Sequence, residues 1–481
     1  MNNRRFIRNY LYNSLYQVLL IITPIITTPY ISRVLGVDYI GTSSYTMAVA
    51  QIFYIIGSMG VFNYGSRAIA YVRESRTKVT EEFWNIWFIQ FVFGILSLII
   101  YYLLFIRLNI LGFYNIFFIQ VFIVLGAIFD ISWLYVGVED FKKNVTRNIA
   151  VKIGGIICIF IFVKNQNDFY KYIIINSVST FLGMISLWMF LFEYVEKFKI
   201  KYIKKNKHLK GTFILLIPQL AIQIYTSLDR TIIGNLSDIT QVGFYDQSQK
   251  LARISLAIVT SLSTVLMPKI ANLYAVKKLD KIEKYLKKSL HFTVALACLI
   301  ITGIVSISNE FVPIFFGEDF IDITLYVKIT SLIIIFIPLG GVFANQFALP
   351  TNKNKEYIIP LVFAAIINVI LNIVLVPKLG ALGGVLSIII TELLTMILRI
   401  LLVRKYLHLR DIIKGIYIYF IACIVSISLT NFIAKVLPFS SFLLFFIKGI
   451  ICVIIYIYIL YVSDNIIRDE IIKIIKNKKV I

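Results

Sequence analysis

Three ionisable side chains share one face of an apolar segment near the middle of the chain. Asp246, Lys250 and Arg253 stand at positions i, i+4 and i+7, on the same side of a helix. With a rise of about 1.5 Å per residue, Lys250 and Arg253 lie about 15 and 20 Å along segment 240–268 from its outer end. Two cations against one carboxylate leave an excess positive charge. Such a face suits a hydrated cavity that receives an anionic headgroup, because Arg binds phosphate through paired donors.

A second polar stripe runs along the preceding apolar segment, 211–235. Gln219, Gln223, Ser227 and Arg230 recur at helical spacing, with Asp229 beside Arg230. Arg230 falls near the outer end of this segment. The stripe predicts a helix that turns its polar side away from lipid.

Two further carboxylates interrupt apolar segments. Glu392 lies close to the middle of segment 380–403, in one stripe with Thr395 and Arg399, and Asp130 lies toward the inner end of segment 112–138. Carboxylates at membrane depth usually face a bundle interior or a wet cavity. Together with Asp246, they are candidates for an acidic cavity lining or for coupling to Na⁺ or H⁺.

The same charges also have a purely structural interpretation. Asp246 with Lys250, and Asp229 with Arg230, would then be internally satisfied pairs that hold helices together. The residues alone leave both interpretations open.

The composition identifies the elements that position these side chains. Of 481 residues 59% are apolar and 15% charged, which excludes a soluble enzyme, a disulfide scaffold and a disordered chain. A spanning helix needs about 20 apolar residues, and the sequence predicts an all-α integral membrane protein with about fourteen such helices. Their ranges are 9–34, 39–65, 83–107, 112–138, 148–164, 170–193, 211–235, 240–268, 289–317, 323–350, 357–377, 380–403, 412–434 and 439–463.

The basic residues predict the direction of these helices. Most of the 48 Lys and Arg residues fall in alternate connections, on the side of the amino terminus. The opposite connections hold only Arg33, Arg107, Lys164, Lys171, Lys328, Lys378 and Lys435. By the positive-inside rule both termini are cytoplasmic. The net charge of +23 is then a membrane feature, and we expect no nucleic-acid partner.

Several classes of site are not expected. The outer connections are about ten residues or fewer, which leaves no room for the acceptor domain of a membrane glycosyltransferase or polymerase. The four cysteines and three histidines lack metal-ligand spacing, and no Gly-rich phosphate loop occurs. We therefore expect no catalytic residues, no metal and no cofactor.

A short repeat suggests two related halves. An Arg, a nearby Gly, an aliphatic-Gly step and a Tyr recur around residues 30–45 and 230–245. The match requires a gap, and chance remains an explanation. A displacement of six helices would give two parallel bundles. The predicted parts are residues 1–210 (helices 1–6), 211–404 (helices 7–12), 405–463 (helices 13–14) and a basic amphipathic cytoplasmic tail, 464–481.

Longer strings resemble a known family. They are PYISRVLG (29–36), NYGSRAIA (63–70), FDISWLYVGVEDFKKNVTRN (129–148), IPQLAIQIYTSLDRTIIG (217–234), GFYDQSQKL (243–251) and FALPTNKNKEY (347–357). They are similar to the polysaccharide-biosynthesis flippases of the multidrug/oligosaccharidyl-lipid/polysaccharide exporter superfamily. The resemblance extends from helix 1 to helix 12.

This resemblance implies two six-helix lobes around a central cavity, plus two extra helices. It implies a flippase in the bacterial cytoplasmic membrane that moves undecaprenyl-pyrophosphate-linked oligosaccharide repeat units to the outer leaflet by alternating access. The product would be a capsule, exopolysaccharide, O-antigen or teichoic-type polymer. Expected partners are this lipid-linked substrate, membrane lipids and other membrane proteins of polysaccharide assembly. By position in the matching strings, the substrate-binding cations are Arg230, Lys250 and Arg253, with Arg33 and Arg67 near the cavity's mouths.

Two other functions are compatible with a helical membrane protein of this size. A small-molecule or multidrug antiporter of the same fold would favour an acidic cavity for cationic substrates, which the excess positive charge of segment 240–268 opposes. A membrane enzyme is opposed by the short outer connections.

Overall fold

The computed structural model describes the chain except residues 1–2, 204–206, 437–439, 464–465 and 470–481. The described residues form helices and turns, with no strand among them. Twelve stretches in this part of the chain are long and apolar enough to cross a membrane. The all-helical membrane fold is therefore confirmed. The predicted basic tail, 464–481, lies almost entirely outside the described residues.

Contacts divide the chain into two compact units, which we call the amino-terminal unit (Met1–Asn235) and the carboxy-terminal unit (Leu236–Ile481). The boundary follows the seventh predicted helix rather than preceding it. A division by contacts and a division by repeated helices need not coincide, so the predicted lobes 1–210 and 211–404 remain a prediction.

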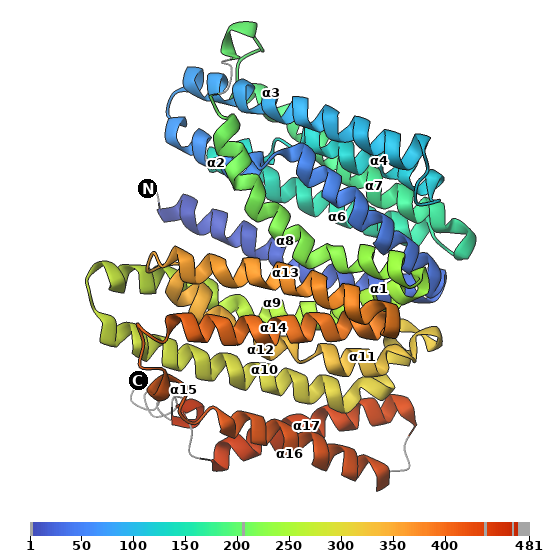
Figure 1. Cartoon of the computed structure of the whole chain (residues 1–481), viewed down its shortest axis with the longest axis vertical. Coiled ribbons are helices and arrows are strands. Elements are labelled where there is room, and N and C mark those ends of the chain that lie inside the picture. The colour runs from blue at the N-terminus through green and yellow to red at the C-terminus, as the bar shows by residue number, and fades with distance from the viewer. Residues whose placement is uncertain (1–2, 204–206, 437–439, 464–465, 470–481) are drawn as a thin grey trace. The chain divides into compact units, whose positions relative to one another are not determined.

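The amino-terminal unit contains eight α-helices within the described residues (Figure 1). They are α1 (Asn3–Ser58), α2 (Val61–Val72), α3 (Arg76–Tyr101), α4 (Tyr114–Phe129), α5 (Ser132–Gly137), α6 (Phe141–Phe162), α7 (Phe169–Ser186) and α8 (Leu209–Leu236). Helices α3, α4 and α6 pack against α1, and α7 packs against α4 and α6.

The carboxy-terminal unit contains nine α-helices in its described part. They are α9 (Ile239–Ala275), α10 (Leu279–Phe316), α11 (Ile323–Thr330), α12 (Ile333–Gly341), α13 (Asn354–Leu379), α14 (Ala381–Val403), α15 (Leu409–Ile413), α16 (Tyr417–Val436) and α17 (Ser441–Val462). Figure 1 shows α16 and α17 running beside each other, and both contact α10.

Two features explain why twelve stretches correspond to fourteen predicted helices. The first two predicted helices form the single stretch Ile21–Val72, in which the connection is one residue, Gly36, with φ 78° and ψ 177°. Only glycine adopts this backbone conformation readily. The seventh predicted helix is α8, which is 28 residues long but is not among the twelve.

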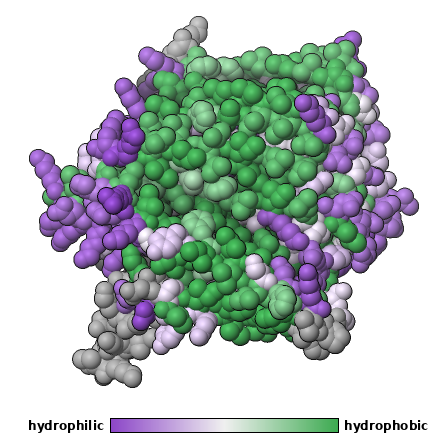
Figure 2. Space-filling view, turned by 60° about the horizontal axis from the view of Figure 1, so that its bottom comes forward, coloured by the Kyte–Doolittle hydropathy of each residue, from purple (hydrophilic) through white to green (hydrophobic). Residues whose placement is uncertain are grey.

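The helices carry apolar flanks and polar ends. On the face that Figure 2 shows, hydrophobic side chains cover the long sides of the helices and hydrophilic side chains gather at the helix ends. Lipid provides no hydrogen bonds for backbone groups, so helices with apolar flanks are the stable spanning element.

A single residue, Gly380, joins α13 to α14. Gly380 has φ 56°, and the next amide, of Ala381, donates to Oε1 of Gln241 at 2.9 Å. A Cβ on Gly383 would lie 2.5 Å from the carbonyl oxygen of Leu375. The absence of a side chain at Gly383 therefore allows α13 and α14 to approach each other closely.

Candidate functional site

A break in the fourth predicted helix positions Asp130. Helix α4 ends at Phe129, Asp130 has an extended backbone (φ −74°, ψ 98°), and α5 begins at Ser132. The last carbonyls of a helix have no partner within it. Here side chains of neighbouring helices supply the partners.

Three side chains cap the end of α4. The Trp87 indole donates to the Ile128 carbonyl at 3.2 Å, and the Trp188 indole donates to the Phe129 carbonyl at 2.8 Å. The Gln90 amide nitrogen donates to the carbonyls of Ala127 and Asp130. The break is therefore held by hydrogen bonds that are buried or partly buried.

The same network orients the Asp130 carboxylate. Tyr54 donates its hydroxyl to Oδ2 of Asp130 at 2.8 Å, and the Ser132 amide donates to Oδ1 at 2.9 Å. Trp133 donates to Oε1 of Gln90 at 3.1 Å. Each carboxylate oxygen keeps a further lone pair, so the group still accepts hydrogen bonds from a ligand.

A pocket of about 310 Å³ opens beside Asp130, entirely within the amino-terminal unit. Helices α1, α2, α3, α5 and α8 and the break after α4 all contribute to it. The lining residues are Tyr54, Ile55, Ser58, Val61, Phe62, Gln90, Asp130, Trp133, Gln219 and Gln223. This pocket, which combines apolar side chains with one carboxylate and three amides, is a candidate site of this unit and is hereafter called the Asp130 pocket.

The polar stripe of α8 contributes one wall of the Asp130 pocket. Gln223 donates to Oε1 of Gln51 at 3.2 Å and to the Ser227 hydroxyl at 2.9 Å. Gln219 also lines the pocket, and no side chain or carbonyl in the described part of the chain accepts from or donates to its amide. Such an amide inside a membrane helix is available to water or a ligand.

Residues just before the start of α8 contact α2 and α3. The Glu82 carboxylate lies 2.9 Å from Nε2 of His208 and also pairs with Lys207. Nδ1 of His208 is 2.9 Å from the Tyr64 hydroxyl. These contacts set the position from which the polar stripe of α8 starts.

Helix α9 carries the predicted cationic face. Nζ of Lys250 lies 3.5 Å from Oδ2 of Asp246, whose side chain is buried, and this is the contact that the structural interpretation of these charges predicts. Arg253 is half-buried, and its Nε is buried without a hydrogen-bond partner. No ion pair involves its guanidinium among the described side chains.

The other predicted cations lie apart from this face along the chain. Arg230 is half-buried near the end of α8, and Arg33 is exposed three residues before Gly36. Arg67 is exposed on α2, where it lines a pocket of about 300 Å³ between α2 and α8. Arg33, Arg67 and Arg230 belong to the amino-terminal unit and Lys250 and Arg253 to the other, so a shared cavity remains a prediction.

Glu392 lies on the buried face of α14. It is 3% exposed and Thr395 is 1% exposed, on the same side of the helix. The stem of Arg399, one turn further, packs against Gly340 of α12. Coupling to Na⁺ or H⁺ at Glu392, Asp246 or Asp130 remains a prediction.

Sequence reasoning missed two parts of this arrangement. Tyr54 and Gln90 hold Asp130 but come from helices far away along the chain, and the only sequence signal was an amide within the apolar segment 83–107. Glu310 pairs with Lys448 at 2.5 Å between α10 and α17, with both side chains buried. The sequence showed Lys448 within a segment but not its partner.

Two curated proteins are similar to this chain in sequence. The chain is 26% identical over 250 residues to a "Putative O-antigen transporter" of Escherichia coli (strain K12), covering 51% of this chain and 60% of that protein. A relative of the same name from Shigella dysenteriae is 22% identical over 244 residues, covering 49% and 57%. The aligned part of the chain thus spans less than two thirds of these curated relatives.

Solved structures share the fold. The "Lipid II flippase MurJ, inward closed conformation" has a TM-score of 0.67 at 15% identity, covering 95% of this chain and 98% of that chain. An inward-facing multidrug resistance MATE family transporter of the MOP superfamily has a TM-score of 0.60 at 15% identity, covering 83% and 99%. At such identities the likeness concerns the fold alone. The family described as "Polysaccharide biosynthesis protein" matches residues 6–274, more than half of the sequence, and the chain belongs to this family.

Proposed function

We propose that the chain is a flippase that moves undecaprenyl-pyrophosphate-linked oligosaccharide repeat units from the cytoplasmic to the outer leaflet by alternating access. The observation that carries this proposal is Arg253, a half-buried guanidinium in a spanning helix with no partner among the described side chains. A membrane-embedded charge is costly unless it faces a wet cavity or a counter-ion. A pyrophosphate would supply that counter-ion.

The chemistry of α9 favours phosphate. Arg donates two parallel hydrogen bonds to phosphate oxygens and stays charged at any physiological pH. Lys250 lies one turn away, 3.5 Å from the Asp246 carboxylate, so this face holds two cations and one carboxylate. Membership of the polysaccharide biosynthesis protein family and the transporter names of the curated relatives support the same substrate class.

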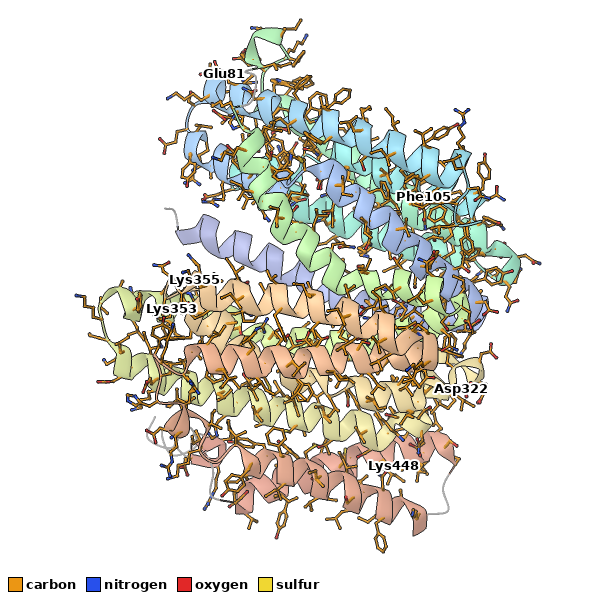
Figure 3. All side chains as sticks on the ribbon, in the orientation of Figure 1. Glu81, Phe105, Asp322, Lys353, Lys355 and Lys448 are labelled. Carbon is orange, nitrogen blue, oxygen red and sulfur yellow. The ribbon has the colours of Figure 1, made fainter. Side chains whose placement is uncertain are left out.

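The distribution of basic side chains supports a cytoplasmic position for both termini, in a bacterial cytoplasmic membrane. Figure 3 shows Lys353 and Lys355 at one end of the carboxy-terminal unit's helices and Asp322 at the opposite end. By the positive-inside rule the lysine end is cytoplasmic. A lipid-linked sugar made in the cytoplasm would then enter from the lysine end.

The alternative is a small-cation antiporter of the same fold. Such a protein needs an anionic binding face, and α9 instead carries more positive than negative charge. The flippase proposal accounts for that excess directly.

The test uses purified protein in liposomes with a fluorescent pyrophosphate-linked glycolipid in both leaflets and a membrane-impermeant quencher. Wild type should make nearly all the lipid accessible to the quencher. The double variant Lys250→Gln/Arg253→Gln should leave only the outer half accessible, because the pyrophosphate loses both cations. Lys378→Gln, which removes an exposed cation at the end of α13, is the matched control and should behave as wild type. Full exchange by the folded double variant would refute the role of α9.

A further inference from the structure

We propose that the Asp130 pocket binds the sugar portion of the substrate, as an uncharged, hydroxyl-rich ring. This inference rests on the flippase function proposed above and assigns a second binding role, to residues other than those of the cationic face of α9. It is carried by the charge, the hydrogen-bonding capacity, the apolar surface and the size of the pocket.

The charge of the pocket excludes the pyrophosphate. Its lining holds one carboxylate, three amides and no Lys or Arg. The Asp130 carboxylate would repel a phosphate bound in the pocket, and no cation among the lining residues offsets that repulsion. An uncharged polar ligand meets no such penalty.

The available hydrogen-bonding groups match a set of ring hydroxyls. The Asp130 oxygens accept from Tyr54 and Ser132 and each retains a lone pair for a hydroxyl donor. The Gln219 amide offers both donors and an acceptor, with no partner in the described chain. Ser58 donates to the Ile55 carbonyl and keeps its oxygen free to accept. Sugar hydroxyls, which donate and accept, complement this set.

Apolar side chains complete the pocket. Phe62 is 42% exposed and lines it together with Ile55 and Val61. A sugar ring has C–H faces as well as hydroxyl edges, so a wall with an accessible aromatic ring beside carboxylate and amide groups fits both. The volume of about 310 Å³ is at the lower end of the range for small-molecule pockets, which suits one ring rather than a whole oligosaccharide.

The carboxylate is held in place before a ligand arrives. Gln90 bonds the backbone at the helix break and accepts from Trp133, and Trp133 stacks on Phe83 with ring centroids 5.3 Å apart. A Cβ on Gly65 would lie 2.5 Å from this Trp133 ring, so α2 packs directly against it. A fixed acceptor loses little entropy on binding.

The test compares two lipids on the full-length protein in detergent. One is the lipid-linked repeat unit extracted from the source cells, and the other is undecaprenyl pyrophosphate without sugar. Gln219→Ala should raise the Kd for the sugar-bearing lipid about two- to tenfold, as expected for one lost hydrogen bond, and leave the Kd for the sugar-free lipid unchanged. Asn176→Ala is the matched control, since the Asn176 amide donates to the carbonyl of Tyr172 one turn earlier in α7 and does not line the Asp130 pocket.

A second variant guards against misfolding. Asp130→Asn keeps the shape of the side chain. It should also weaken the binding of the sugar-bearing lipid alone, and its thermal unfolding should match that of wild type. If either variant raises the Kd of both lipids equally, or changes the Kd of neither, the pocket does not bind sugar. A Kd of wild type that is the same for both lipids would also overturn this inference while leaving the flippase function intact. A wild type that binds neither lipid would overturn both proposals.

Discussion

Two cations within spanning helices of the carboxy-terminal unit differ in whether a carboxylate compensates their charge. Lys448 is buried and pairs with Glu310, whereas the Arg253 guanidinium has no carboxylate partner in the described chain. Taking a charge out of water costs several kcal/mol unless a partner compensates it. The paired lysine therefore suits a structural contact between α10 and α17, and the guanidinium on α9 suits a ligand.

The Glu310–Lys448 pair predicts strong coupling between two residues. Glu310→Gln or Lys448→Met alone leaves one uncompensated buried charge, which typically costs about 3–5 kcal/mol. The double variant removes both charges and should lie closer to wild type than either single variant does. Thermal and denaturant unfolding in detergent measure the effect as a double-mutant cycle. Additive losses would show that the two side chains do not interact across α10 and α17.

At the scale of elements, the helix breaks are as important as the helices. Gly36 joins the two halves of α1, Gly60 separates α1 from α2, and Asp130 separates α4 from α5. At each break the helix is interrupted by only one or two residues, without a long loop. The pocket around Asp130 exists because α4 stops before the membrane segment is complete.

Gly60 is the break with the least tolerance for a side chain. Its φ is +71°, and a Cβ would lie 2.4 Å from the Thr212 carbonyl oxygen and 2.6 Å from the Leu216 nitrogen of α8. Gly60→Ala should lower the unfolding temperature by several degrees, because both the backbone conformation and the packing are incompatible with alanine. Gly154→Ala in α6, where nothing lies within 4 Å of the new Cβ, should be neutral or stabilising. Equal effects of the two substitutions would contradict this packing.

The sequence predicts helices better than it predicts breaks. Apolar runs and basic connections are local signals, and they gave the all-helical membrane fold and the Asp246–Lys250 contact. The tight connection at Gly36 depends on backbone angles, and the partners of Asp130 are side chains from other helices. Hydrophobic periodicity carries no information about either. Tyr54 is 76 residues away from Asp130 along the chain.

At the scale of the whole molecule, charge and hydropathy determine how the chain sits in a membrane. Figure 3 places Glu81 toward the start of α3 and Phe105 toward the far end of the same stretch, and Lys353 and Asp322 at opposite ends of the carboxy-terminal unit. Clustered lysines on one side of the membrane fix its direction. We therefore expect each unit to have an inner and an outer end, and the proposed flippase would move the lipid headgroup from the inner to the outer end.

The orientation gives a prediction that needs no substrate. The four cysteines Cys158, Cys298, Cys423 and Cys452 are free and lie within helices, so they can be replaced by serine or alanine to give a background without reactive thiols. In that background Asp322→Cys, in the connection before α11, should react with a membrane-impermeant maleimide in intact spheroplasts. Lys353→Cys, in the connection before α13, should react only after the membrane is permeabilised. Both positions are polar connection residues, so each serves as the control for the other's reactivity. Labelling of Lys353→Cys in sealed spheroplasts would reverse the orientation, and the direction of lipid movement proposed from it.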